Sequence, residues 1–240
     1  MAMLRLDKFL ADMGVGTRSD VKQYIRKGLV LVNDEVVKKP ECKVDSEADQ
    51  VECKGVRIGY SRYEYYMLNK PQGVVSATED NRDKTVLELI TDSSRKDLFP
   101  VGRLDKDTEG LLLITNDGKL SHELLSPKKH VPKTYFVRVD GLVTQEDIDL
   151  FAEGFQVDAE LYSKPAVLEI WKAGEQSEVH LTITEGKFHQ VKRMFQAVNK
   201  PVLYLQRVRM GRLELDRSLA LGEYRALTEE ELISLTVVED

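Results

Sequence analysis

Residues 102–118 read GRLDKDTEGLLLITNDG, and this stretch organises the interpretation of the whole chain. Its apolar run, residues 111–115, predicts a buried strand, and the Asn-Asp-Gly that follows predicts a reversal of the chain. Asp105 stands on the loop that enters this strand, where a rigid scaffold can hold its carboxylate in one position. The stretch therefore predicts a functional carboxylate on a loop at the end of a buried strand.

The composition around this stretch is that of a globular protein. The chain has 240 residues, of which 42% are hydrophobic and 32% charged, well above the hydrophobicity of disordered chains. It has no apolar run of membrane-spanning length and no signal-peptide core, so we expect a cytoplasmic protein without a membrane segment. Cys42 and Cys53 are too far apart for a CxxC motif and the histidines are scattered, so we expect reduced thiols and no metal site.

The net charge of −6 weighs against a nucleic-acid partner, but phosphate contacts depend on local patches. Such a patch is predicted near the N-terminus. An apolar stripe over residues 4–14 predicts one helix, and Thr17, with Asp20 three residues later, predicts the capped start of a second. Along this second helix three cations recur at every fourth position and form one row, namely Arg18, Lys22 and Arg26.

Strand signals follow the two helices. Turns are expected at Asn33-Asp34 and Lys54-Gly55, so residues 29–58 predict two hairpins. We therefore expect a small domain over 1–60 and a second domain over 61–240. In the second, strands and helices mix without regular alternation, which favours an α+β fold with flanking helices and a mixed, largely antiparallel sheet.

Residues 5–33, RLDKFLADMGVGTRSDVKQYIRKGLVLVN, resemble the S4-like RNA-binding domain, whose second helix faces RNA phosphates. The opening stretch resembles the signature of pseudouridine synthases, in the branch that modifies ribosomal RNA and carries such a domain. Three further segments match this family in order and spacing: YMLNKPQGVVSA at 66–77, PKTYFVRV at 132–139 and EGKFHQVKRMF at 185–195. Shorter matches, such as KPAVLEI at 164–170 and LGEYRALTEEE at 221–231, favour the branch that acts on small-subunit rRNA.

The resemblance implies a role for four residues. Asp105 is the catalytic carboxylate, and Lys192 is the cation that salt-bridges it, at a position where some relatives carry Arg. Tyr135 stacks on the uracil, and Arg103 enters near the position that the flipped nucleotide vacates. The candidates for an RNA-facing basic surface in the second domain are Lys70, Lys128, Lys129, Lys133, Arg193, Arg207 and Arg209.

The implied reaction is the isomerisation of a specific uridine to pseudouridine, in which the N1–C1′ bond breaks and C5 joins C1′. It requires no cofactor, because no redox change, group donor or metal takes part, and either attack at C1′ of the ribose or attack at C6 of the base can use one ionised carboxylate. The expected partner is 16S rRNA or a small-subunit assembly intermediate, and the family expectation is a monomer.

Three alternatives stay open from the sequence. The first is a synthase of the same family that acts on 23S rRNA. The second is a non-catalytic RNA-binding factor for ribosome assembly, whose second domain serves only as a scaffold. The third is a carboxylate-based glycoside or nucleotide hydrolase, which usually needs a second acid; Asp107 is the near candidate.

Overall fold

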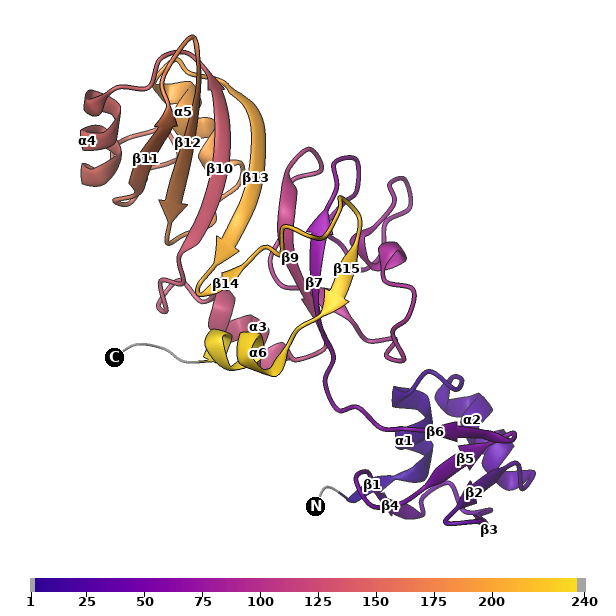
Figure 1. Cartoon of the computed structure of the whole chain (residues 1–240). Helices are drawn as coiled ribbons and strands as arrows, with labels where there is room; N and C mark the ends of the chain where they lie inside the picture. Colours follow the sequence, from indigo (N-terminus) through magenta and orange to yellow (C-terminus); the bar gives the residue numbers. More distant parts are fainter. Residues whose placement is uncertain (1–2, 237–240) are drawn as a thin grey trace. The chain divides into compact units, whose positions relative to one another are not determined.

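The computed structural model describes residues 3–236, and these residues form two compact units. The N-terminal unit comprises residues 3–64 and 91–98, and the C-terminal unit comprises residues 65–90 and 99–236. The expected division was 1–60 and 61–240. The boundary in the structure lies four residues later, after residue 64, and the N-terminal unit also includes the internal segment 91–98 (Figure 1).

The N-terminal unit is built from two short helices and small antiparallel sheets. Its elements are β1 (Met3–Arg5), α1 (Leu6–Asp12), α2 (Arg18–Arg26), β2 (Val30–Val32), β3 (Glu35–Val36), β4 (Lys43–Asp45), β5 (Val51–Cys53) and β6 (Val56–Ile58). The strands pair in the order β3-β2-β5-β6, with β1 against β4. The predicted turns are confirmed, because Asn33, Asp34 and Lys54 adopt the positive φ that tight hairpin turns require.

The predicted start of α2 is also confirmed. Asp20 N donates to Thr17 Oγ1, and Thr17 N donates to the Asp20 carboxylate, which is a complete capping box. Buried side chains of both helices, among them Phe9, Val21 and Ile25, form the core with strand residues. Because the apolar side of α2 points inward, Arg18 and Arg26 are exposed and Lys22 is half-buried.

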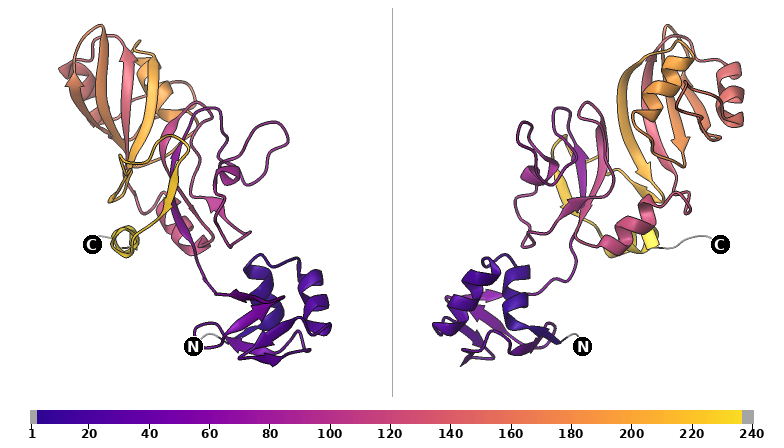
Figure 2. Two further views of the ribbon diagram at one scale, coloured as in Figure 1. Left: turned by 45° about the vertical axis from the view of Figure 1, so that its right-hand side comes forward. Right: turned by 180° about the vertical axis from the view of Figure 1, so that it is seen from behind.

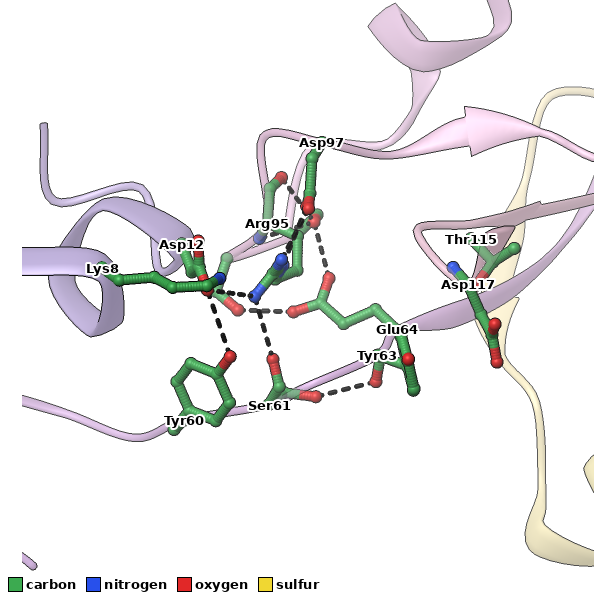
Figure 3. A network of polar contacts seen from close by, with 12 residues as sticks. Lys8, Asp12, Tyr60, Ser61, Tyr63, Glu64, Arg95, Asp97, Thr115 and Asp117 are labelled. Atoms are coloured by element: carbon green, nitrogen blue, oxygen red, sulfur yellow. Dashed lines mark hydrogen bonds and ion pairs between the residues drawn. The ribbon is translucent and has the colours of Figure 1, made fainter. Parts of the chain in front are cut away.

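The segment 91–98 is attached to the N-terminal unit through Arg95, whose side chain is 5% exposed. Its guanidinium donates twice to Asp97, at 2.6 and 2.8 Å, and lies 3.8 Å from Asp12 (Figure 3). A buried guanidinium is stable only when it is paired and hydrogen-bonded, and two carboxylates meet that need here. Ser93 and Ser94 add hydrogen bonds to Glu64. This loop therefore belongs to the small unit although it is remote in sequence.

The C-terminal unit contains one large sheet with helices beside it. Its elements are β7 (Tyr65–Lys70), η1 (Val86–Leu89), β8 (Phe99–Pro100), β9 (Glu109–Thr115), α3 (Gly118–Leu125), β10 (Lys133–Asp140), α4 (Gln145–Glu153), β11 (Val167–Lys172), β12 (Gln176–Ile183), α5 (Gln190–Ala197), β13 (Val202–Met210), β14 (Leu213–Glu214), β15 (Tyr224–Ala226) and α6 (Glu229–Thr236).

The sheet follows the order β11-β12-β10-β13-β9-β7-β15, and β13–β9 is the parallel pair in it. β11 pairs with β12 in an antiparallel arrangement. The other pairs are antiparallel, so the α+β class with a mixed, largely antiparallel sheet is confirmed. α5 covers one face of β10, β12 and β13 (Figure 2), where Phe151 of α4 packs on Phe195 of α5 at 5.2 Å between ring centroids.

Gly110 permits the parallel junction of β9 with β13. Its φ is +100°, and a Cβ built there would lie 2.3 Å from the carbonyl oxygen of Arg207. Only glycine allows the backbones to approach this closely. Because β9 begins at the loop that carries Asp105, this junction brings that loop beside β10 and β13.

Candidate active site

Asp105 lies on the loop that enters β9, and this loop is held by a buried lysine. Lys70, at the end of β7, is 0% exposed. Its Nζ donates to the carbonyl oxygens of Asp105 (3.0 Å), Thr108 (2.9 Å) and Pro71 (3.0 Å). Burial lowers the pKa of Lys70 to about 8, although the nearby Asp105, Asp107 and Glu109 carboxylates oppose this shift. The ammonium thus replaces water as the partner of the loop carbonyls and fixes the backbone of Asp105.

The Asp105 carboxylate faces the first turn of α5. Lys192 Nζ donates to its Oδ2 at 3.0 Å, and His189 Nε2 lies 3.6 Å from its Oδ1. The side chain of Asp105 is 27% exposed, so it is open to a ligand from the pocket side while one oxygen is held by an ammonium. The carboxylate is therefore held in an ion pair with Lys192.

Asp107 shares the same lysine. Lys192 Nζ donates to Asp107 Oδ1 at 2.5 Å, and this hydrogen bond is the largest cause that lowers the pKa of Asp107. Burial acts to lower the pKa of Lys192, but its hydrogen bonds to Asp107 and Asp105 outweigh burial and raise it. Lys192 therefore stays charged across the neutral range and is fixed between two carboxylates.

Arg103, Asp105, Tyr135 and Lys192 line one pocket of the C-terminal unit. Tyr135 of β10 is 8% exposed, and the apolar side chains of Ile183, Val191 and Leu205 complete the walls together with Leu104. The structure thus brings together the four residues that the sequence marked, although they come from a loop, a strand and a helix. The pocket thus offers an aromatic side chain and a carboxylate to a bound flat ring, and the exposed Arg103 is available for a phosphate.

Lys70, Lys133 and Arg207 are buried, which corrects their expected place on an RNA-facing surface. The exposed fractions of Lys70, Lys133 and Arg207 are 0%, 8% and 2%. Lys133 Nζ donates to the carbonyl oxygen of Val131, and Arg207 Nε donates to that of Leu111, so these cations support strands and loops. The alternation of residues along a strand does not predict this burial, since the long side chain of a lysine or arginine can bend back and donate to backbone carbonyl oxygens.

Arg193 differs from these three because it is partly exposed. It makes a two-pronged ion pair with Asp158, at 2.6 and 2.7 Å, and this hydrogen bond is the largest cause that lowers the pKa of Asp158 to about 2. Its guanidinium also donates to the carbonyl oxygen of Phe188 at 3.4 Å. Arg193 is therefore occupied by intramolecular partners, while Lys128 and Lys129 are exposed.

Lys133→Met is expected to remove a pH-dependent part of the stability. Burial, with the charge of Arg207 as a smaller cause, lowers the pKa of Lys133 from 10.5 to about 8. Between pH 8 and 10.5 the unfolded chain keeps a proton that the folded chain has lost, so the free energy of unfolding rises with pH in this window. The wild type should gain about 2 kcal/mol relative to the Met variant between pH 7.5 and 10.5.

Urea unfolding at a series of pH values measures this difference. It can be followed by the fluorescence of Trp171, the single tryptophan of the chain, which lies in the same unit. Parallel stability curves for the two proteins would contradict a buried, desolvated amine at position 133.

Two residues beside Asp105 have no role in the pseudouridine synthase interpretation of the sequence. His189 lies in the closing motif without an assigned role, and Asp107 is only the near candidate for the second acid of a hydrolase. His189 stands three positions before Lys192, and this spacing places both side chains on the same side of the helix start. The D-x-D spacing of Asp105 and Asp107 is the sequence signal for a role of Asp107. Only the position of α5 shows that both carboxylates accept hydrogen bonds from the same lysine, Lys192.

Within residues 3–236, no group of three or more His, Cys, Asp or Glu side chains is arranged to hold a metal ion. Over the same residues, no helix has the length and apolar character needed to cross a membrane. Cys42 and Cys53 are free thiols, and Cys53 is buried.

Comparison with known proteins places this geometry in a family. The RNA pseudouridylate synthase family matches residues 64–197, and the S4 domain matches residues 4–51. Ribosomal small subunit pseudouridine synthase A of Escherichia coli K12 is 42% identical, with 97% of this chain and 100% of that protein covered. An uncharacterized RNA pseudouridine synthase of Bacillus subtilis is 50% identical over 95% of this chain and 97% of its own length. A crystal structure of a pseudouridylate synthase, 39% identical, superposes with a TM-score of 0.68 over 97% of this chain and 100% of that one.

Proposed function

The chain belongs to the RNA pseudouridylate synthase family and carries an N-terminal S4 domain, and from this premise we propose that it converts one uridine of 16S rRNA to pseudouridine with Asp105 as its catalytic carboxylate. The observation that carries the proposal is the pocket that Asp105, paired with Lys192, lines together with Tyr135 and Arg103. The small-subunit substrate is supported by relatives at 41–43% identity named for the small ribosomal subunit.

The reaction exchanges one glycosidic bond for another. The N1–C1′ bond breaks, the uracil turns within the pocket, C5 bonds to C1′, and the proton on C5 leaves while N1 gains one. Asp105 is the group that attacks or assists departure of the base, and it needs its negative charge to do so. Lys192 supplies the cation that keeps this charge inside a partly apolar pocket. The atoms of substrate and product are the same, so no donor is consumed.

Retention of the detached base is the second requirement. Tyr135 is nearly buried in the pocket wall, so it can stack on the uracil while the base turns. Arg103 is exposed at the rim, where a guanidinium can stack in the space that a flipped nucleotide leaves and bind the flanking phosphates. The row Arg18, Lys22 and Arg26 on α2 is the proposed phosphate contact of the S4 domain.

Release of tritium from RNA labelled at C5 of uridine tests this proposal. With the intact protein, 16S rRNA transcripts should release tritium in stoichiometric amount with one pseudouridine, whereas 23S transcripts should release none. Chemical mapping of pseudouridine in rRNA from cells lacking the protein then identifies the uridine. Release from 23S rRNA alone would reassign the substrate to the large subunit. Release from neither, with RNA binding intact, would favour a non-catalytic assembly factor, and free uracil as product would indicate a hydrolase.

A further inference from the structure

Phe188 is an exposed aromatic residue in the turn that borders the pocket, and it has no part in the chemistry described above. Phe188 is 75% exposed, which is the largest exposed fraction among the large hydrophobic residues that the structure describes. It lies between Lys187 and His189, and both of these line the pocket. Single exposed apolar residues are common on protein surfaces, so it is the position of this ring next to two pocket-lining residues that makes it a candidate contact for a ligand.

The Phe188 ring is stacked on the imidazole of His189. The two ring centroids are 3.8 Å apart and the ring planes differ by 19°. The same imidazole approaches the catalytic carboxylate, because His189 Nε2 lies 3.6 Å from Asp105 Oδ1. One imidazole therefore contacts both the Phe188 ring and Asp105.

The backbone that presents Phe188 is strained and firmly held. His189 adopts φ +50°, a conformation that few residues other than glycine take. The turn before it is bracketed by Gln190, which is 3% exposed and bonds to Lys187 N and to the Glu185 carboxylate. Strained positions that a surrounding structure fixes in this way cluster at functional sites. Because the turn is fixed, the ring is already in place before a ligand binds.

We infer that Phe188, supported by His189, is a stacking platform for an unpaired base that flanks the target uridine. The charges of the pocket suit this occupant, since Arg103, Lys187 and Lys192 line it against one lining carboxylate, Asp105. Single-stranded RNA is bound in this manner, by cations along the backbone and by aromatic rings on which successive bases stack. The inference rests on the proposed function, because it takes the base in the pocket to be the target uridine.

The test uses the full chain and an oligouridylate nonamer that carries 2-aminopurine beside its central uridine. Stacking quenches the emission of 2-aminopurine. The wild type should quench it, while Phe188→Leu, which keeps apolar bulk but loses the ring, should leave it bright and raise Kd by about 5- to 100-fold. Phe188→Trp should restore both. Trp171→Leu is the matched control, since Trp171 is another exposed aromatic, 65% exposed, but lies on β11, whereas Phe188 lies between two residues that line the pocket.

On a 16S rRNA transcript, Phe188→Leu should raise KM with little change in kcat. The reason is that Phe188 stacks on the base next to the target uridine and does not contact the reacting uridine itself. Unchanged emission and Kd in Phe188→Leu, or an equal loss in Trp171→Leu, would overturn the inference. A wild type that quenches 2-aminopurine through Phe188 yet forms no pseudouridine in rRNA would instead contradict the proposed function and leave the platform standing.

Discussion

Asp105→Asn is expected to lower pseudouridine formation by at least about 10⁴-fold, since removing the central group of a catalytic site typically costs this much or more. Asparagine has the same shape and can still accept a hydrogen bond from Lys192 through its amide oxygen. It lacks the negative charge and the nucleophilicity that either route through the reaction requires. The substitution therefore tests the contribution of the negative charge of Asp105 while the shape of the side chain and its hydrogen bond from Lys192 are kept. Single-turnover tritium release from C5-labelled 16S rRNA measures the rate.

Asp107→Asn is the matched control for this variant. Asp107 lies two residues away, bonds to the same lysine and has a side chain that is 69% exposed. An ion pair so accessible to water contributes about 1 kcal/mol or less, which corresponds to a change in rate below about tenfold. Both variants should bind RNA as the wild type does. An Asp107→Asn variant as inactive as Asp105→Asn would assign the catalysis to the pair of carboxylates.

Lys70→Met is expected to lower kcat by about 100-fold while RNA binding is preserved. Methionine has a similar length but donates no hydrogen bond, so the carbonyl oxygens of Pro71 and Thr108 lose the buried donor that holds them. The loop that carries Asp105 then shifts relative to Lys192 and Tyr135. A displacement of about 1 Å in a catalytic group is enough for a loss of this size.

The salt dependence of binding distinguishes this positioning role from contact with RNA. A lysine that contacts phosphate contributes about 0.9 to the slope of log K against log salt, and its loss reduces that slope. Because Lys70 is 0% exposed, Lys70→Met should keep both the Kd and the slope of the wild type. Lys129→Met, at an exposed position, provides the comparison. A weaker, less salt-dependent complex with Lys70→Met and an unchanged kcat would contradict the positioning role.

Local structure was predictable because local interactions determine it. The capping boxes at Thr17 and Thr144 depend on side chains three residues apart, and the turn at Asn33-Asp34 depends on residues that tolerate positive φ. The alternation along β12 likewise marks its buried face, because every second residue of this strand is buried and most of the others are half-buried.

Packing between distant segments was not predictable, because no short-range pattern encodes it. The segment 91–98 carries ordinary polar residues, and contacts with residues distant in sequence, such as those of Arg95 with Asp12 and of Ser93 with Glu64, attach it to the N-terminal unit. Lys70 precedes a proline turn and is typical of a surface loop in sequence. Whether such a lysine faces water or backbone depends on where residues 105–108 lie, and that position follows from the pairing of β9 with β7.

The amino-acid sequence by itself determined the family and the carboxylate on which the proposed chemistry depends, since both reside in short motifs. It also determined the α+β class, since the periodicity of each strand and helix is a local property. The tertiary structure decided which charges serve that carboxylate. It placed Lys192 between Asp105 and Asp107, turned Lys70, Lys133 and Arg207 away from solvent, and stacked Phe188 on His189 beside the pocket. The physical reason is that the burial and partners of a cation or an aromatic ring are set by the segments packed against it, and these lie far away in the chain.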